Sequence, residues 1–152
     1  MTRVAIVLAT AGGVGYIPFA PGTGGSLIGL LIFLATRYSP LSWQIGLFLA
    51  ITIVGIWAST IAERYFQKDD PGPVVIDEVA GQMVTLLATG VGVTGGVVGF
   101  LLFRVLDVVK PPPSDRFERL PRGFGVMGDD LMAGLYGNLL LQIGVRVMPG
   151  VL

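Results

Sequence analysis

The chain has 152 residues, of which 53% are hydrophobic and only 13% charged, and its ten basic side chains balance ten acidic ones. Because a soluble domain has roughly 25% charged residues, this composition disfavours a water-soluble bundle, and the zero net charge points to no nucleic-acid partner. The absence of cysteine and histidine excludes disulfides, thiolate or phosphohistidine intermediates and a Ser-His-Asp triad, so any catalysis must rest on carboxylates, Lys or Arg, hydroxyls and a hard metal ion.

The apolar segments predict an all-α integral membrane helical bundle, a single domain over residues 1–152 with about four to five membrane helices. Glycines and a proline interrupt residues 1–20, so we expect a short or re-entrant helix there. The hexapeptide 21–26 (PGTGGS) predicts a turn before a helix over 27–36. Such a glycine-flanked helix start suits a bound anion, and a loop with a helix cap is the alternative. The next apolar segment, 43–62, is long enough to span a bilayer.

Polar segments separate the remaining predicted helices. Residues 63–73 predict a surface loop, and 74–89 predict a helix that is apolar except at Asp77, Glu78 and Gln82. A glycine-rich break at 90–96 precedes a helix over 100–110, which the prolines at 111–113 end because proline does not continue a helix. Residues 114–128 predict a charged loop. Asp129 and Asp130 begin the final helix, 131–148, where acids suit the helix dipole.

The predicted helices bring the polar motifs to one side of the membrane if each helix crosses once. Most basic residues fall on that same side, which the positive-inside rule makes cytoplasmic. We therefore expect a multi-pass protein of the inner (cytoplasmic) membrane whose site faces the cytoplasm. The basic residues on this side are Arg64, Lys68, Lys110, Arg116, Arg119 and Arg122, against Arg37 and Arg146 on the other.

Five carboxylates fall on the predicted cytoplasmic side, enough for an octahedral oxygen site. Mg²⁺ prefers such oxygen ligands and usually keeps waters and a substrate phosphate. Structural ion pairs or simple helix-end charges are the alternatives. Gly81 lies one helical turn after the first of these acids, and its missing side chain would let a neighbouring helix or a ligand approach. The five candidates are Asp77, Glu78, Asp107, Asp129 and Asp130.

Basic side chains accompany these acids. Arg104, Asp107 and Lys110 are spaced by three residues and share one helix face. A salt-bridged helix edge, with Lys110 extending to water, is the alternative. In the following loop, Arg119 and Arg122 are candidates for binding phosphate or anionic headgroups, and a solvated loop face is the alternative.

With these motifs placed, the sequence resembles the phosphatidylglycerophosphatase A family. The matching blocks cover roughly residues 15–135 in the family's order and spacing. Arg122 stands where the family commonly has another glycine, and the loop after Arg119 looks one residue short. The blocks are PGTGGSL at 21–27, IDEVAGQ at 76–82, FRVLDVVKPPP at 103–113, FER at 117–119 and GFGVMGDDLMAG at 123–134.

The resemblance implies a Mg²⁺-dependent membrane phosphatase of phospholipid biosynthesis, a phosphoric monoester hydrolase that converts phosphatidylglycerophosphate into phosphatidylglycerol and inorganic phosphate. In this hypothesis the five carboxylates are metal ligands or the general base, while Lys110 and Arg104 neutralise charge on the phosphoryl group. Thr23 and Ser26 would hold phosphate oxygens, and a covalent route through either stays open. The two loop arginines would bind the substrate.

A small membrane ion or proton transporter is the main alternative function, because intramembrane acids also mark ion pathways. A transporter predicts polar residues along both halves of its helices, whereas here they cluster at one end. A CDP-alcohol phosphotransferase would need an Asp-rich signature that the sequence lacks. Nothing in the sequence sets an oligomeric state.

Overall fold

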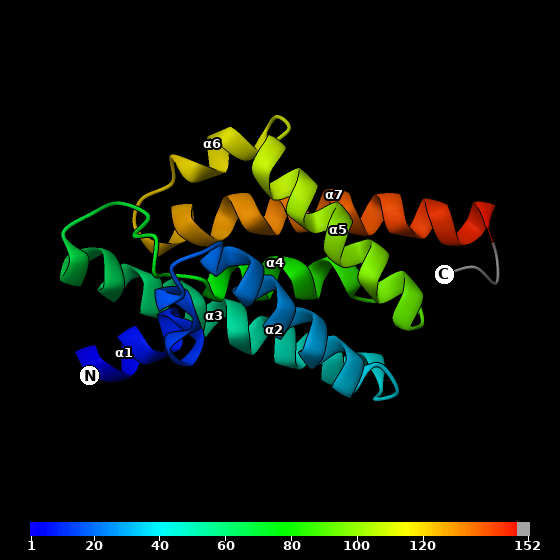
Figure 1. The fold of residues 1–152 in the computed structure, drawn as a ribbon, viewed down its shortest axis with the longest axis horizontal. Helices are drawn as coiled ribbons and strands as arrows, with labels where there is room; N and C mark the ends of the chain where they lie inside the picture. Colours follow the sequence, from blue (N-terminus) through cyan, green and yellow to red (C-terminus); the bar gives the residue numbers. More distant parts are fainter. Residues whose placement is uncertain (149–152) are drawn as a thin grey trace.

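A computed structural model describes residues 1–148, apart from the side chains at positions 115 and 118. Every regular element among them is helical, which confirms the predicted all-α fold, and the N-terminal segment forms the expected short helix. The elements are shown in Figure 1 and run in the order α1 (Thr2–Ala9), η1 (Ala11–Tyr16, a 3₁₀ helix), α2 (Pro21–Thr36), α3 (Leu41–Phe66), α4 (Ile76–Leu86), α5 (Val93–Val109), α6 (Ser114–Glu118) and α7 (Gly123–Val147).

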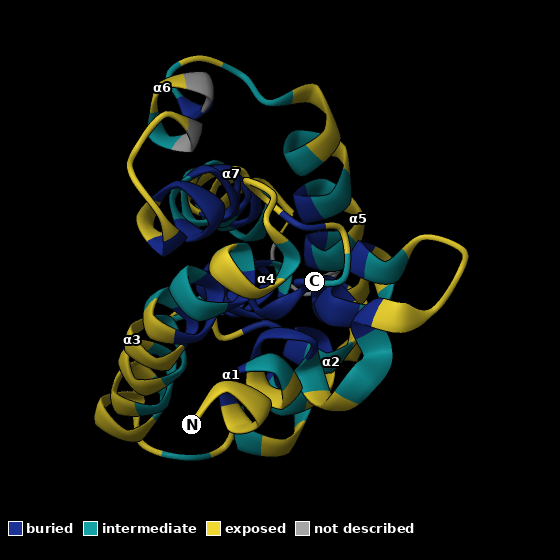
Figure 2. Cartoon of the chain, turned by 90° about the vertical axis from the view of Figure 1, so that its left-hand side faces the viewer, coloured by how far each residue is buried: buried dark blue, intermediate teal, exposed yellow. Residues whose placement is uncertain are grey.

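The short helix α4 is the core on which the four longest helices pack. All of its residues except Glu78 are buried, and it contacts α2, α3, α5 and α7. Figure 2 shows α4 in the middle of the bundle, with these longer helices around it. With 11 residues it is only about 16 Å long, so it is too short to span a bilayer by itself.

Glycines let two of these helices approach α4 closely. A Cβ atom at Gly25 or Gly29 of α2 would lie 2.6 Å from a carbonyl oxygen in or just before α4. A Cβ atom at Gly134 of α7 would collide with the carbonyl oxygen of Gly81. Backbone therefore packs on backbone at both contacts, as in other close helix crossings built on small residues.

Side-chain hydrogen bonds tie two helix ends to neighbouring helices. The N–H of Gly123, at the start of α7, donates to Oγ1 of Thr60 in α3 at 3.1 Å. The first N–H groups and the last carbonyl groups of a helix mostly lack partners within it, so such bonds fix the position of one helix on another. At the other end of α4, the Nδ2 of Asn138 in α7 donates at 2.8 to 3.1 Å to the carbonyl oxygens of Val84, Thr85 and Leu87.

Four predicted boundaries are wrong. Helix α3 continues through Phe66, where the sequence predicts a loop from residue 63. Residues 21–26 form the first turns of α2 rather than a loop, because Pro21 suits the first helical position and the glycines pack on α4. Helix α5 begins at Val93 rather than at residue 100, since its glycines also face packed neighbours. The predicted loop 114–128 contains α6 and the first turns of α7, so Asp129 and Asp130 lie about two turns inside α7.

Within residues 1–148, α3 is the one helix both long and apolar enough to cross a membrane. It has 26 residues, about 39 Å of helix, and its most apolar part is only 22% buried, unlike a core helix of a soluble protein. Helices α2 and α5, with 16 and 17 residues, are shorter than the roughly 20 residues that a span needs. By length and composition the structure thus supports one span, where the sequence predicts about four to five.

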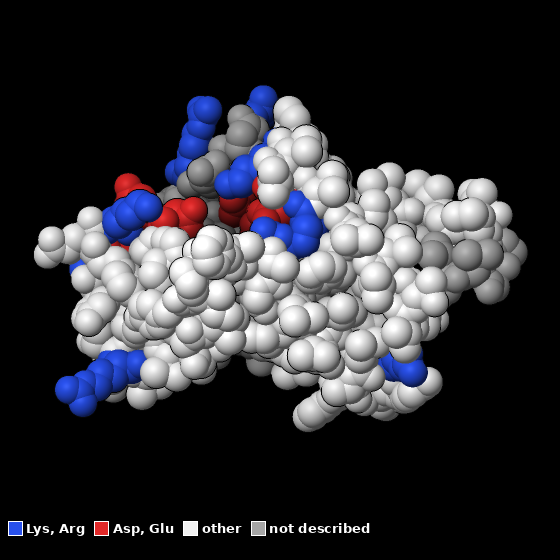
Figure 3. Space-filling view, viewed as in Figure 1, with Lys and Arg blue, Asp and Glu red and all other residues white. Residues whose placement is uncertain are grey.

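Charged side chains gather at one end of the molecule. In the view of Figure 3 they cluster at the upper left, around α6 and the start of α7, while most of the remaining surface is uncharged. The uncharged surface is rich in exposed apolar side chains, a composition unusual for a protein that faces only water. Examples from four helices, each 56 to 66% exposed, are Leu31, Ile53, Leu101 and Leu139.

Candidate active site

Three carboxylates meet where α4 and α7 cross. Asp77 and Glu78 lie in the first turn of α4, and Asp130 lies about two turns into α7. One carboxylate oxygen from each lies within 4.8 Å of the others, close enough to hold one metal ion. Asp77 and Asp130 are only 7% and 4% exposed. We call this cluster of Asp77, Glu78 and Asp130 the acidic triad.

The acidic triad is electrostatically unfavourable by itself. Burial, reinforced by neighbouring carboxylates, raises the pKa of Asp77 and that of Asp130 well above the usual range. Burial also raises the pKa of Glu78, which the Arg104 guanidinium partly opposes. Within the described part of the chain, one buried oxygen of each acid has no hydrogen-bond partner: Oδ1 of Asp77, Oε2 of Glu78 and Oδ2 of Asp130. Three neighbouring carboxylates that each have an unpartnered buried oxygen fit a hard cation such as Mg²⁺.

The crossing of α4 and α7 depends on Gly81, one turn after Asp77. A Cβ atom there would lie 2.5 and 2.6 Å from two ring atoms of Phe103 and 2.8 Å from the carbonyl oxygen of Asp130. Phe103, on α5, is fully buried and fills the space beside the crossing. The sequence predicts that a neighbouring helix or a ligand approaches at Gly81. In the structure α7 approaches there, which brings Asp130 close to the acids of α4.

Arg104 reaches this region from α5. Its Nη1 donates to Oδ2 of Asp107 at 2.7 Å and to Oγ of Ser26 at 3.3 Å. Ser26 is fully buried and itself donates to the carbonyl oxygen of Gly22 at 2.9 Å. A Cβ atom at Gly22 would collide with the carboxylate of Glu78, so the start of α2 lies directly beside the acidic triad.

Lys110 connects the end of α5 to α7. It follows α5 in a left-handed conformation, with φ at 47°, and its Nζ donates to Oδ2 of Asp129 at 2.7 Å. Burial raises the pKa of Asp129, and Lys110 partly opposes this. The two predicted metal ligands outside the acidic triad, Asp107 and Asp129, are thus each paired with a basic side chain.

A hollow of about 580 Å³ opens beside Asp129. The two loop arginines predicted to bind substrate, Arg119 and Arg122, line it and are exposed. Charged residues of the α3–α4 loop complete its wall, and we call this space the charged hollow. Its charged lining residues are Glu63, Lys68, Asp69, Asp70, Arg119, Arg122 and Asp129.

The predicted phosphate-binding hydroxyls at the start of α2 have different surroundings. Thr23 is exposed, and its N–H donates to the carbonyl oxygen of Ala20 at 3.0 Å. Ser26 is buried and hydrogen-bonded on both sides. The structure therefore brings Ser26 to Arg104 and leaves Thr23 at the surface.

The α3–α4 loop is the part of the site that sequence reasoning missed. We interpreted residues 63–73 only as a surface loop, yet Asp69 and Asp70 line the charged hollow. Asp70 also contributes to the raised pKa of Asp77 and that of Asp129. The sequence contains a signal that could have identified these residues. Charged residues are dense before α4, on the same predicted side of the membrane as the other motifs.

Comparison with known proteins assigns the chain to a family. A family model described as Phosphatidylglycerophosphatase A matches residues 7–145. The chain belongs to the phosphatidylglycerophosphatase A family. This confirms the resemblance drawn from the motifs, and it makes the protein a phosphatase of that family.

The names of three relatives specify two different substrates. "Phosphatidylglycerophosphatase A" of Escherichia coli is 34% identical over 153 residues, covering 96% of this chain and 87% of its own. The protein of the same name from Haemophilus influenzae is 34% identical over 139 residues, covering 89% and 85%. A Bacteroides thetaiotaomicron protein named "Putative phosphatidylinositol-3-phosphatase" is 35% identical over 146 residues, covering 91% of both chains. No solved structure gives a significant match.

Proposed function

We propose that this protein is a Mg²⁺-dependent membrane phosphatase that hydrolyses phosphatidylglycerophosphate to phosphatidylglycerol and inorganic phosphate. The observation that carries the proposal is the acidic triad, whose buried oxygens lack partners while basic side chains lie next to it. Two relatives that bear this substrate in their names align with more than four-fifths of the chain, which supports this substrate over others.

In this proposal Asp77, Glu78 and Asp130 hold the metal ion. A bound Mg²⁺ would counter charge on the phosphoryl oxygens and make a water molecule more acidic. Asp107 and Asp129 would remain outside the coordination shell, because each already accepts a short hydrogen bond from a basic side chain.

The reaction adds water across the ester bond between the terminal phosphorus and a glycerol oxygen. The water oxygen bonds to phosphorus, its proton passes to a carboxylate, and the glycerol oxygen leaves and gains a proton. Arg104, near Glu78, and Lys110, bound to Asp129, would counter the negative charge on the transferring group. Ser26 would position Arg104 rather than attack phosphorus, because it is buried and already hydrogen-bonded.

The charged hollow would receive the rest of the lipid headgroup. Phosphatidylglycerophosphate carries a phosphodiester, a glycerol hydroxyl and the terminal phosphate. Arg119 and Arg122 suit the phosphodiester, since guanidinium groups bind phosphate through paired hydrogen bonds. Asp69 and Asp70 line the same hollow from the α3–α4 loop. Their carboxylates suit the glycerol hydroxyl as hydrogen-bond acceptors.

We also propose that the bundle lies in the cytoplasmic membrane as a multi-pass protein. Helix α3 would span the bilayer, and the shorter apolar helices α2 and α5 would lie in the same layer with α7. The exposed apolar side chains on all four helices support this placement. The charged end would face the cytoplasm, because most of the basic residues belong to it.

The direct test uses the full chain purified in detergent. Phosphate release is measured from phosphatidylglycerophosphate, phosphatidylinositol 3-phosphate and phosphatidic acid, each with Mg²⁺ and with EDTA. We expect the first lipid to be hydrolysed fastest and EDTA to stop the reaction. Faster hydrolysis of the inositol lipid would move the substrate assignment to that class, and activity that survives EDTA would refute the metal site.

A further inference from the structure

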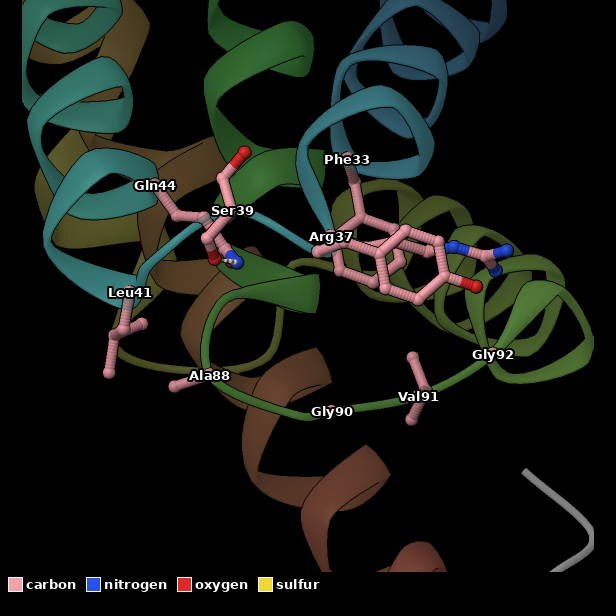
Figure 4. A pocket seen from close by; sticks show the side chains of 10 residues that line it. Phe33, Arg37, Ser39, Leu41, Gln44, Ala88, Gly90, Val91 and Gly92 are labelled. Carbon is pink, nitrogen blue, oxygen red and sulfur yellow. Dashed lines mark hydrogen bonds between the residues drawn. The ribbon is translucent and has the colours of Figure 1, made fainter.

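A second pocket lies far from the acidic triad, at the other end of α2. It has a volume of about 420 Å³ and is formed by the turn between α2 and α3 together with the loop between α4 and α5. Figure 4 shows the α2–α3 side chains grouped over that loop. Its lining includes Phe33, Arg37, Tyr38, Ser39, Gln44 and Gly92. We call it the Arg37 pocket.

Arg37 has no acidic partner in this pocket. No acid occurs in residues 1–62 or 79–106, the stretches that supply the whole lining. The Nε of Arg37 is buried and, among the residues that the structure describes, meets no hydrogen-bond acceptor. A buried donor on a charged group is costly when unpaired, so the pocket lacks an anion that the chain itself does not provide.

The geometry around Arg37 leaves its donors available to a ligand. The guanidinium carbon lies 4.6 Å from the centre of the Tyr38 ring, so the ring covers one face of the guanidinium. A stacked guanidinium keeps its N–H groups at its edge, the arrangement that binds phosphate oxygens. Gln44 does not replace the anion: its Nε2 donates to the carbonyl oxygen of Ser39 at 3.0 Å, as Figure 4 shows, and no acceptor among the described residues, its own Oε1 included, bonds to the Nε of Arg37.

The position of the pocket identifies the anion. It adjoins Leu41, where the proposed membrane span α3 begins, and Tyr38 and Trp43 beside it are 86% and 61% exposed. Exposed aromatic residues at the end of a span are typical of the membrane–water interface. With α3 spanning the membrane as proposed above, an anion at that depth, opposite the charged end, would be the headgroup of a lipid.

We propose that the Arg37 pocket binds the phosphate of an anionic phospholipid in the leaflet opposite the reaction site. This proposal rests on the membrane placement given above, but not on the identity of the lipid that is hydrolysed. Bound lipid would hold the α2–α3 turn to the α4–α5 loop, at an end of the bundle where no ion pair is seen among the residues that the structure describes.

The test measures lipid binding to the full chain in detergent by native mass spectrometry and by the shift in Tm. The ligands are phosphatidylglycerol, phosphatidylcholine and inorganic phosphate, and the variants are Arg37→Gln and, as a matched control, Arg146→Gln. We expect phosphatidylglycerol to bind the wild type and Arg146→Gln alike, and Arg37→Gln about tenfold more weakly. Equal binding by Arg37→Gln, or an equal shift with phosphate alone or with phosphatidylcholine, would overturn the proposal.

Two further measurements keep the outcome unambiguous. In the wild type, a photoactivatable phosphatidylglycerol should label peptides containing residues 37–44 or 86–92, and label found only near 63–70 and 119–130 would overturn the proposal without any variant. Phosphatase activity of Arg37→Gln should equal that of the wild type. If the wild type proves inactive while lipid still binds through Arg37, the proposed enzymatic function fails and this site stands.

Discussion

Nζ of Lys110 lies 2.7 Å from Oδ2 of Asp129, a residue 19 positions later in the chain. The pair joins the end of α5 to α7 immediately before Asp130, the α7 member of the acidic triad. A lysine held in this way is a positioned point charge whose location is set by two helices. It therefore has two possible roles, balancing a buried carboxylate or meeting the phosphoryl group of the substrate.

Replacing Lys110 distinguishes these roles. We expect Lys110→Met to lower kcat by about 10²-fold, because a cation that stabilises the transferring group contributes that much in other active sites. The variant should also have a lower Tm, since it leaves Asp129 buried without this partner. Steady-state hydrolysis and thermal unfolding in detergent measure the two effects.

The double variant Lys110→Met with Asp129→Asn is the control. It removes the unpaired carboxylate, so we expect it to recover most of the Tm. It should remain as inactive as the single variant if Lys110 meets the phosphoryl group. Recovery of activity in the double variant would show that Lys110 only balances Asp129.

Removing one acid of the triad should have opposite effects on stability and on metal binding. Asp130→Asn removes an acid whose ionisation is unfavourable beside Asp77 and Glu78, so we expect the metal-free protein to gain Tm. The same change should abolish the increase in Tm that Mg²⁺ gives to the wild type, and lower activity by at least about 10²-fold. Thermal unfolding with EDTA and with Mg²⁺ measures both.

Asp69→Asn is the matched control for this change, because Asp69 is an exposed acid that lines the charged hollow. We expect it to keep the Mg²⁺-dependent rise in Tm. If Asp130→Asn kept that rise while Asp69→Asn lost it, the metal site would have to be sought in the charged hollow instead.

The fold class was predictable because helix-forming apolar segments dominate the sequence, and the α3 segment was located within a few residues. The cluster of polar motifs at one end followed from helices that run back and forth, without any knowledge of packing. Thus the sequence indicated that Asp77 and Asp130, 53 positions apart, would lie near each other.

Most of the wrong helix boundaries come from glycines, whose effect depends on what packs against them. Residues 21–26 and 123–128 are rich in glycine and were predicted as a turn and a loop, but they form helix because missing side chains allow close contact with α4 and α3. By helix propensity alone, each glycine destabilises a helix by about 1 kcal/mol relative to alanine. The pair of Arg104 and Asp107 was among the alternatives, as a salt-bridged helix edge, but spacing could not show that Lys110 pairs with Asp129 on another helix.

Gly81 provides a test of the helix crossing that assembles the triad. A Cβ atom there would lie 2.5 Å from the nearest ring atom of Phe103 and 2.8 Å from the carbonyl oxygen of Asp130. We expect Gly81→Ala to destabilise the protein by about 1–3 kcal/mol and to lower Mg²⁺ affinity, because α7 must move away from α4. Thermal unfolding and Mg²⁺ titration measure the two effects.

Gly46→Ala is the control for this substitution, since a Cβ atom at Gly46, within α3, meets nothing within 4 Å. Alanine there should be neutral or stabilising by up to about 1 kcal/mol. Wild-type Mg²⁺ affinity in Gly81→Ala would mean that the acids of α4 and α7 do not depend on this crossing.

Arg122 offers the last prediction, because its backbone conflicts with its side chain. It precedes α7 with φ at 59° and ψ at −153°, a conformation that is essentially restricted to glycine and costs other residues about 1–3 kcal/mol. The resemblance to the family implies a glycine at this position, which this backbone conformation would suit. We expect Arg122→Gly to raise Tm, even after part of the gain is lost to the greater entropy of the unfolded chain.

The same substitution should weaken substrate binding, because Arg122 lines the charged hollow. We expect KM for phosphatidylglycerophosphate to rise with little change in kcat, since the guanidinium would contact the headgroup and not the transferring phosphate. Arg122→Gln separates the effects, because it removes the charge and keeps the strained backbone, so KM should rise without a gain in Tm. A lower Tm in Arg122→Gly would show that the side chain stabilises the start of α7 by more than the strained backbone costs.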